Sequence, residues 1–292
     1  MVTLEATILL QILVNGLLLG SLYALLSVSL NLLAGVFKII NFAHGELLML
    51  GMYAVYWFRT LWNIYPMHGA FLTSLLFLPL GFFLFKGVFK PLLSKPHLNQ
   101  LIITIALSIC LQGIAQLLWK TDFKVIRFEV GRIEVYGASV SILYLVILTI
   151  ALLSSLLLWF FLMRTHIGIK IRAVAQDAIM SELMGIKTEK IYVLNMLISF
   201  LLAGLAGGLL ICIFPAHPAV GVEFGLFAWV IIVIGGMGSV IGALLGGLLL
   251  GFIYVAASYI WSAELSLAII FAFFIATLLF KPRGLFGAKA RV

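Results

Sequence analysis

Long uncharged runs of apolar residues constrain this chain more than any other feature. Each run reaches the length of about 20 residues that a helix needs to cross the hydrocarbon of a bilayer. The runs are Ala6–Phe37, Thr60–Phe85, Leu98–Trp119, Val140–Met163, Ile191–Val222 and Phe224–Ala263. Strands of a membrane β-barrel would alternate between apolar and polar residues instead. The pattern therefore predicts an all-α, polytopic helical membrane protein with about eight hydrophobic segments.

No separate soluble domain fits between these runs. The longest intervening stretches, Lys120–Ser139 and Arg164–Lys190, are too short to bury a core of their own. We therefore expect residues 1–292 to form one transmembrane domain. Because the N-terminus lacks the basic region of a cleavable signal peptide, its apolar run is predicted to remain as a span.

Basic loops predict the side of the membrane on which each connection lies. The formal net charge of +8 comes largely from Lys and Arg in the loops, where they act as topology signals rather than as a nucleic-acid surface. By the positive-inside tendency, the loop at 164–190, the stretch Lys86–Lys95 and the tail after Phe280 belong in the cytoplasm. Alternating crossings then place the loop at 120–139 outside.

That outer loop has the pattern of a short hairpin. Phe128–Val130 and Ile133–Val135 would flank a tight turn at Gly131-Arg132. Such a hairpin either caps the helix ends beneath it or contacts an external solute-binding protein.

The apolar run Phe224–Ala263 must begin and end outside, because the preceding span leaves the cytoplasm and the final span returns to the basic tail. It can do so as two tight spans or as a broken, re-entrant helix pair. Neighbouring glycines weaken a helix by roughly 1 kcal/mol each, which predicts a break at Gly235, Gly236, Gly238 and Ser239. Non-helical backbone at membrane depth is tolerated against protein or a water-filled path, so the break is a candidate lining for a solute route.

Other glycines recur at four-residue spacing. Gly16 and Gly20 form one such pair, and Gly247 and Gly251 form another. Small residues at this spacing let helix backbones approach closely, so we expect these glycines to serve helix packing.

Two short polar segments could carry function. In the first, Ile167, Ile171, Val174 and Ala178 fall at helical spacing, and Gly185 is placed to end the helix. This pattern predicts a short amphipathic helix in the 164–190 loop. The pattern alone does not separate a helix that lies on the lipid surface from one that docks into a partner.

In the second segment, Asn41, His44 and Glu46 begin an otherwise apolar span. Polar side chains near membrane depth usually face the interior of a helix bundle. Their role is either hydrogen bonding between helices or direct solute contact. Their spacing spreads them around a helix, and a His and a Glu alone do not supply the three or four ligands of a zinc site, so we predict gate residues and no metal.

Several motifs are missing from the sequence. It contains no phosphate-binding loop of the type Gly-x-x-x-x-Gly-Lys-Ser/Thr and no nucleophile elbow or zinc-protease motif. We therefore expect a transport subunit that is not an enzyme and binds no cofactor. An intramembrane enzyme built on His44 and Glu46 lacks a nucleophile and a complete metal site.

Four motifs follow one another along the chain: Asn15–Tyr53 with its segment Ile40–Glu46, Arg172–Ile186, Gly235–Ser239 and Lys281–Gly287. In this order they resemble the motifs of the LivH-type permeases, which are membrane subunits of branched-chain amino-acid ABC importers. The resemblance runs from about residue 11 to residue 287.

The resemblance implies an assembly of two permease subunits, two cytoplasmic ATPase subunits that use ATP, and an external solute-binding protein. The second permease is either a sister type or another copy. This chain would then lie in the prokaryotic inner membrane, and the 164–190 loop would be a coupling loop that contacts a cytoplasmic ATPase subunit. Its implied contact residues are Arg172, Ala173, Gln176, Asp177, Leu183 and Gly185. The family often has other residues at Ala178, Ile179 and Ser181.

The resemblance leaves the solute open among branched-chain and other amino acids, amides and urea. The competing hypothesis is an ion-coupled secondary carrier, which would work without ATPase partners.

Overall fold

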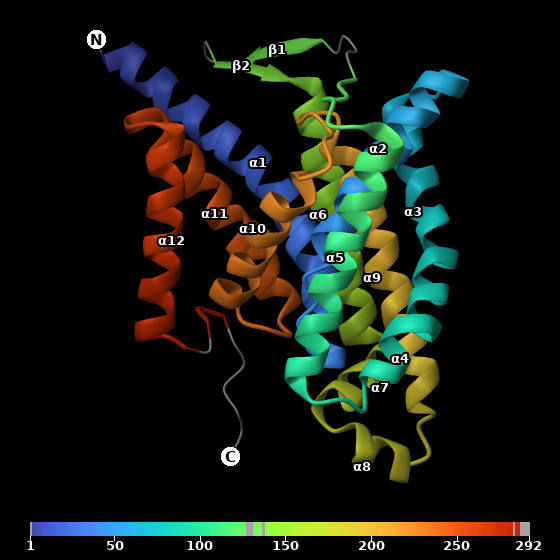
Figure 1. The fold of residues 1–292 in the computed structure, drawn as a ribbon. Helices are drawn as coiled ribbons and strands as arrows, with labels where there is room; N and C mark the ends of the chain where they lie inside the picture. The colour runs from blue at the N-terminus through green and yellow to red at the C-terminus, as the bar shows by residue number, and fades with distance from the viewer. Residues whose placement is uncertain (1, 127–130, 136–137, 283, 287–292) are drawn as a thin grey trace.

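The computed structural model describes residues 2–126, 131–135, 138–282 and 284–286. These residues form a bundle of long helices with one two-stranded hairpin at its end (Figure 1). Seven of the helices among them are long and apolar enough to cross a membrane. The prediction of an all-α, polytopic membrane protein is confirmed. The elements are α1 (Val2–Phe37), α2 (His44–Trp62), α3 (Pro66–Leu84), a π-helical turn (Phe85–Phe89), α4 (Lys90–Leu92), α5 (His97–Trp119), β1 (Arg132–Val135), β2 (Ala138–Ser141), α6 (Ile142–Arg164), α7 (His166–Gln176), α8 (Ala178–Leu183), α9 (Thr188–Leu210), α10 (Val220–Gly235), α11 (Val240–Ile260) and α12 (Ala263–Phe280).

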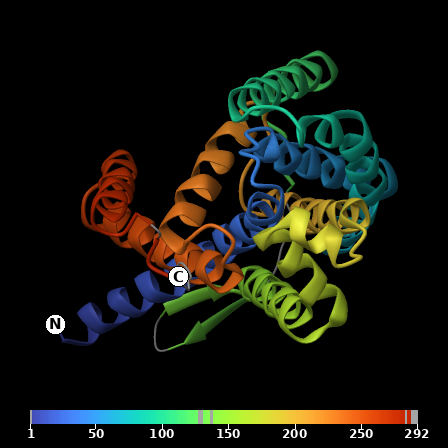
Figure 2. The same cartoon turned by 90° about the horizontal axis from the view of Figure 1, so that it is seen from below.

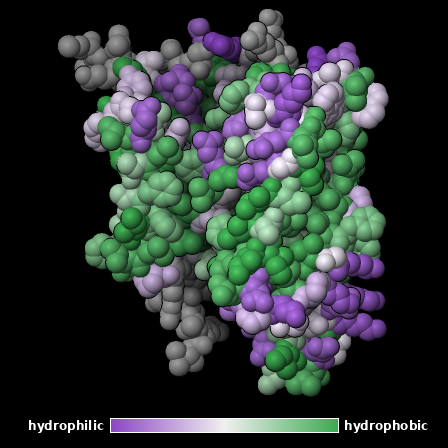
Figure 3. Space-filling model, viewed as in Figure 1, coloured by the Kyte–Doolittle hydropathy of each residue, from purple (hydrophilic) through white to green (hydrophobic). Residues whose placement is uncertain are grey.

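The basic connections lie together at one end of the bundle. In Figure 1, α4, α7, α8 and the end of α12 lie at the lower end, whereas the start of α1 and the hairpin lie at the upper end. We call these the basic end and the hairpin end. Apolar side chains cover the middle of the face shown in Figure 3, and hydrophilic ones gather at both ends. This arrangement agrees with the predicted alternation of spans.

The hairpin exists, and the predicted strand Ile133–Val135 lies within β1, but the predicted turn at Gly131-Arg132 was wrong because Arg132 already belongs to β1. Arg132–Val135 pairs antiparallel with Ala138–Ser141, and Val135 lies opposite Ala138. The connection therefore falls at Tyr136-Gly137, which lies outside the described residues together with Phe128–Val130. The sequence offers two glycines for a tight turn, and the prediction chose Gly131 instead of Gly137.

Helix α1 runs through the middle of the bundle, between α11 and α9 (Figure 2). Its contact with α11 depends on small residues, as predicted. A methyl group added to Gly251 would overlap the backbone of Gly20, and one added to Gly16 would lie 2.9 Å from Cα of Phe252. Lipid tails are as apolar as the side chains, so the hydrophobic effect does not drive helices together in a bilayer. Close backbone contact of this kind stabilises the helix pair through van der Waals packing instead.

The broken helix pair is present at the predicted position. Helix α10 ends at Gly235, and α11 begins at Val240. Gly236 and Gly238 have φ of 97° and 84°, a region that favours glycine. Helix α10 has only 16 residues, which is shorter than the roughly 20 residues of a full span. Its start therefore lies below the hairpin end, as Figure 1 shows.

Candidate functional site

The break between α10 and α11 is held by an asparagine of α1. The N–H of Gly238 donates to Oδ1 of Asn31 at 2.7 Å, and Nδ2 of Asn31 donates to the carbonyl oxygen of Ser239 at 2.7 Å. The Ser239 hydroxyl also caps α11 by accepting from the N–H of Gly242 at 3.0 Å. Backbone groups that the break leaves without helical partners are thus satisfied within the protein.

The C-terminal tail contacts the same break. The N–H of Leu285 donates to the carbonyl oxygen of Ile234 at 2.7 Å. Gly284 has a φ of 81°, and a side chain there would collide with Gly236. The tail motif noticed in the sequence therefore has a structural role at the end of α10.

Asn31 was not among the predicted site residues. The available signal was an amide between two leucines, in Leu30-Asn31-Leu32, within a long apolar helix. Its side chain is only 1% exposed, and such a buried amide needs partners. Sequence alone did not show that those partners lie about 200 residues further along the chain.

The polar side chains at the start of α2 make hydrogen bonds with several different neighbours. Oδ1 of Asn41 accepts from the N–H of Ala43 at 3.1 Å, which shapes the non-helical linker before α2. Nε2 of His44 lies 2.8 Å from the hydroxyl of Ser29 on α1. The hydroxyl of Thr104 on α5 holds the same linker at the carbonyl oxygen of Ile40, at 3.1 Å. As predicted, His44 and Glu46 do not converge on one ligand.

Glu46 points away from His44, toward α5. Its Oε1 accepts from the hydroxyl of Ser108 at 3.0 Å and from Nε2 of Gln112 at 2.8 Å. Oε2 is buried and has no hydrogen-bond partner in the described part of the chain. It lies against Gly221 of α10, where an added methyl group would be 2.5 Å from it.

The starts of α2 and α10 meet backbone to backbone. A methyl group on Gly45 would overlap the carbonyl of Gly221, and it would lie 3.0 Å from Cα of Gly225. Since α10 begins below the hairpin end, this contact places two helix starts together inside the bundle. A further bond joins α9 to α1, from the Ser199 hydroxyl to the carbonyl oxygen of Ser29 at 2.7 Å.

Two pockets line the face between α5 and α10, and they share Trp229. The inner pocket, of about 500 Å³, is nearer the basic end and contains Lys38 and Ile40 of the linker and Met237 and Gly238 of the break. Gly238 is the predicted gate residue that lines it, whereas Asn41, His44 and Glu46 are not among its lining residues. The groove pocket, of about 230 Å³, contains Phe42, Ile105, Ser108, Ile109, Gln112, Gly221, Val222, Gly225, Leu226 and Trp229.

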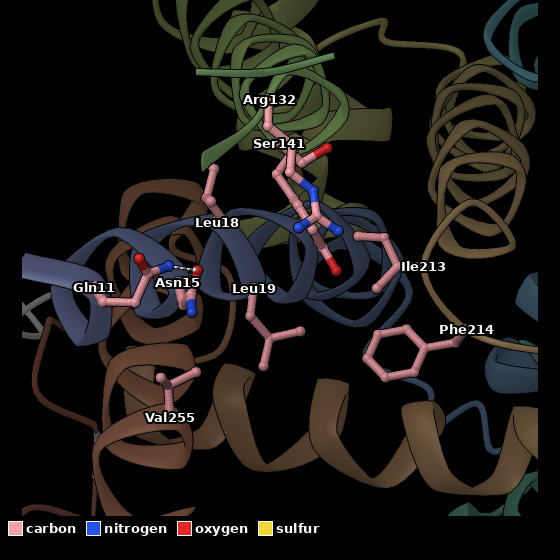
Figure 4. Close-up of a pocket in the computed structure, with 10 residues that line it drawn as sticks. Gln11, Asn15, Leu18, Leu19, Arg132, Ser141, Ile213, Phe214 and Val255 are labelled. Atoms are coloured by element: carbon pink, nitrogen blue, oxygen red, sulfur yellow. Dashed lines mark hydrogen bonds between the residues drawn. The ribbon is translucent and has the colours of Figure 1, made fainter. Parts of the chain in front are cut away.

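An outer pocket of about 590 Å³ lies beside the hairpin (Figure 4). Arg132 of β1 reaches into it, and Gln11 and Asn15 of α1 face it while joined by a hydrogen bond of 3.1 Å. Its apolar wall includes Phe214, which packs edge-on against Phe224 of α10. The pocket is therefore lined by polar side chains of α1 and β1 and by apolar side chains that include Phe214.

The 164–190 loop forms two short helices instead of the single amphipathic helix that was predicted. Ile171 and Val174 are buried as expected, but Ile167 is 44% exposed. Asp177 interrupts the helix, because its Oδ1 accepts from the N–H of Met180 at 3.0 Å and caps α8. Asp favours such caps over helix interiors. Gly185 ends the segment with a φ of 83°, as predicted.

Most of the predicted coupling residues are available at the surface. Arg172 and Gln176 are exposed on α7, and Ala173 is half-buried. Leu183 is 76% exposed on α8. The segment is also joined to the linker before α2, because Nζ of Lys38 donates to the carbonyl oxygen of Gln176 at 3.3 Å.

The described residues contain no group of three or more His, Cys, Asp or Glu that could hold a metal ion. The two ion pairs found in this part of the chain, Lys90–Glu189 and Lys124–Asp122, are exposed to different degrees and lie outside the groove. The site thus consists of hydrogen bonds, close glycine contacts and pockets.

Comparison with known proteins identifies the family of this chain. Residues 12–278 match the family described as the permease component of branched-chain amino acid transport systems. The chain belongs to this permease family. Transport, rather than catalysis, is therefore its role, and the family does not favour the ion-coupled carrier.

Named relatives span nearly the whole chain. The high-affinity branched-chain amino acid transport system permease protein BraD of Pseudomonas aeruginosa is 32% identical over 95% of both chains. The LivH permease of Escherichia coli K12 is 31% identical, also over 95% of both chains. A LivH protein of Methanocaldococcus jannaschii, described as a probable branched-chain amino acid transport permease, is 26% identical over 95% of this chain and 92% of its own length. No solved structure matches the chain significantly.

Proposed function

We propose that this chain forms the membrane path of an ATP-driven importer of branched-chain or closely related amino acids. It would pair with a second permease subunit in the prokaryotic inner membrane, with the basic end in the cytoplasm. Two ATPase subunits would bind ATP at that end, and an external binding protein would deliver solute at the hairpin end. Family membership and the names of the relatives support the solute class.

The single observation that carries the ATPase contact is the apolar tip of α8. We use this name for Ile179, Met180, Leu183 and Met184, which are all strongly exposed, with Met184 at 83%. The tip projects beyond the bundle at the basic end, and Figure 3 shows apolar surface there among hydrophilic residues. Exposed apolar patches with a polar rim mark protein interaction sites. Apolar side chains of a short helix can bind in a hydrophobic groove of a partner protein, here the ATPase subunit.

The loop is connected to the gate segments. Lys38, which bonds α7, belongs to the linker that lines the inner pocket. The preceding residue, Phe37, packs against Phe85, Phe89 and Tyr192. A movement of α7 imposed by an ATPase would therefore reach the linker directly. Such rigid-body coupling is what alternating access requires.

The face between α5 and α10 suits the second permease subunit. Leu98, Ile102 and Ile109 of α5 are exposed, as are Val222 and Leu226 of α10. The groove pocket and the inner pocket open between these rows. A partner that covers this face would turn the two pockets into an enclosed route along the membrane normal.

A substitution in the tip tests the proposed ATPase contact. The chain would be assembled with its ATPase and permease partners, and Leu183→Asp would be compared with the apolar control Leu183→Met. We expect Leu183→Asp to lose co-purification of the ATPase while the permease remains in the membrane. The control should retain the complex. Retention of the ATPase by Leu183→Asp, with normal uptake, would refute docking at α8.

A further inference from the structure

The groove pocket contains a hydroxyl and an amide group on the side formed by α5. Ser108 and Gln112 of α5 supply them, and both bond Oε1 of the buried Glu46 behind the pocket wall. The remaining lining residues are apolar side chains and two glycines of α10, and no Lys or Arg is among the described residues that line it. The pocket thus has these polar groups and an aliphatic and aromatic remainder.

Glu46 fixes how Gln112 presents its amide. A carboxylate accepts hydrogen bonds and does not donate them, so the NH₂ group of Gln112 must face Glu46. Nε2 lies 2.8 Å from Oε1 of Glu46 and 3.4 Å from the Ser108 hydroxyl. Both amide hydrogens are then directed to the wall. The carbonyl oxygen of Gln112 is left as an acceptor for a ligand in the pocket.

A cationic ligand group in the pocket would favour the ionised form of Glu46 behind the wall. Glu46 is 1% exposed and takes part in neither of the ion pairs of the described residues. A buried carboxylate without a cation is costly in a medium of low dielectric constant, and a ligand cation close by would offset that cost. Oε2 of Glu46 has no hydrogen-bond partner among the described residues, so the carboxyl group keeps an acceptor that the protein does not use.

We propose that the groove pocket is a solute site that binds a primary ammonium group at Gln112 and Ser108, with the aliphatic part of the solute against Ile105, Ile109 and Leu226. Glu46 is a positioning residue, because it orients Gln112 and supplies charge without lining the pocket. The inference rests on the proposed function and deepens it. It assigns recognition of the solute's amine to the permease itself, in addition to any selection by a binding protein.

Competition between two half-molecules of leucine tests the site in the wild-type protein. Binding of labelled leucine to the assembled complex in nanodiscs, without the binding protein, would be challenged with 3-methylbutylamine and with 4-methylpentanoate. The first keeps the ammonium group and the second keeps the carboxylate. We expect the amine to displace leucine at concentrations where the acid does not. Displacement by the acid alone, or undetectable leucine binding by a complex that transports leucine, would overturn the proposal.

A matched pair of variants on α5 locates the site. Gln112→Met removes the acceptor with little change in volume, and we expect leucine to bind at least about 10-fold more weakly, the size of one lost hydrogen bond to a charged group. Gln116→Met, one turn further on and outside the pocket, should bind as the wild type does. Equal binding by all three proteins would refute the site. Failure of the wild-type complex to transport any branched-chain amino acid would instead refute the proposed function.

Discussion

Replacing Asn31 with Leu should release the break between α10 and α11. Asn31 is buried and makes two hydrogen bonds of 2.7 Å, to the N–H of Gly238 and to the carbonyl oxygen of Ser239. Leu has a similar size but leaves both backbone groups without a partner. Each unsatisfied group costs about 1–3 kcal/mol, so the arrangement in which the break packs against α1 loses at least about 2 kcal/mol of stability. A loss of that size raises the population of molecules in which this loop has separated from α1 roughly 30-fold.

A buried cysteine beside the break would report this change. Val240 is 7% exposed, so Val240→Cys, in a chain whose Cys110 and Cys212 are replaced by Ser, should react slowly with a small water-soluble thiol reagent. We expect Asn31→Leu to raise that rate at least tenfold. The control is Asn195→Leu, because Asn195 is an equally buried amide that bonds Leu32 and not the break. An unchanged rate in Asn31→Leu, or an equal rise in the control, would refute the clamp.

Three further substitutions test other parts of the account. Gly185→Val places a β-branched residue at a φ of 83°, at a cost of about 1–2 kcal/mol, and should lower uptake per ATP hydrolysed; an unchanged ratio would count against a coupling role for this loop. Glu46→Gln keeps an acceptor for Ser108 and Gln112 and should preserve more uptake into proteoliposomes than Glu46→Ala, whereas equal, complete loss would indicate an essential charge. Gly251→Ala collides with Gly20 and should lower the melting temperature in detergent, while Gly113→Ala on α5 meets nothing within 4 Å and should not; equal melting temperatures would contradict the packing of α1 on α11.

Patterns that depend on neighbouring residues were predictable from the sequence. The length of the apolar runs follows from the thickness of the bilayer. The break at Gly235–Ser239 and the glycine that ends α8 follow from the conformational preferences of glycine. The glycine pairs of α1 and α11 also gave the correct role, because spacing on one helix determines which face is small.

Pairings between distant segments were not predictable in the same way. Asn31 bonds a loop that follows it by about 200 residues, and the tail at Leu285 bonds the end of α10. Nothing local specifies these partners. The hairpin turn was misplaced because two glycines competed for it, and the division of α7 from α8 depended on whether Asp177 capped a helix or lay inside one.

Transport driven by ATP is the most direct test of the proposed function. The chain would be reconstituted in proteoliposomes with its permease and ATPase partners, and its binding protein would deliver labelled leucine from outside. The account predicts uptake that requires ATP on the side of the basic end and persists when ionophores remove proton and sodium gradients. Uptake driven by an ion gradient without ATP or ATPase subunits would contradict it.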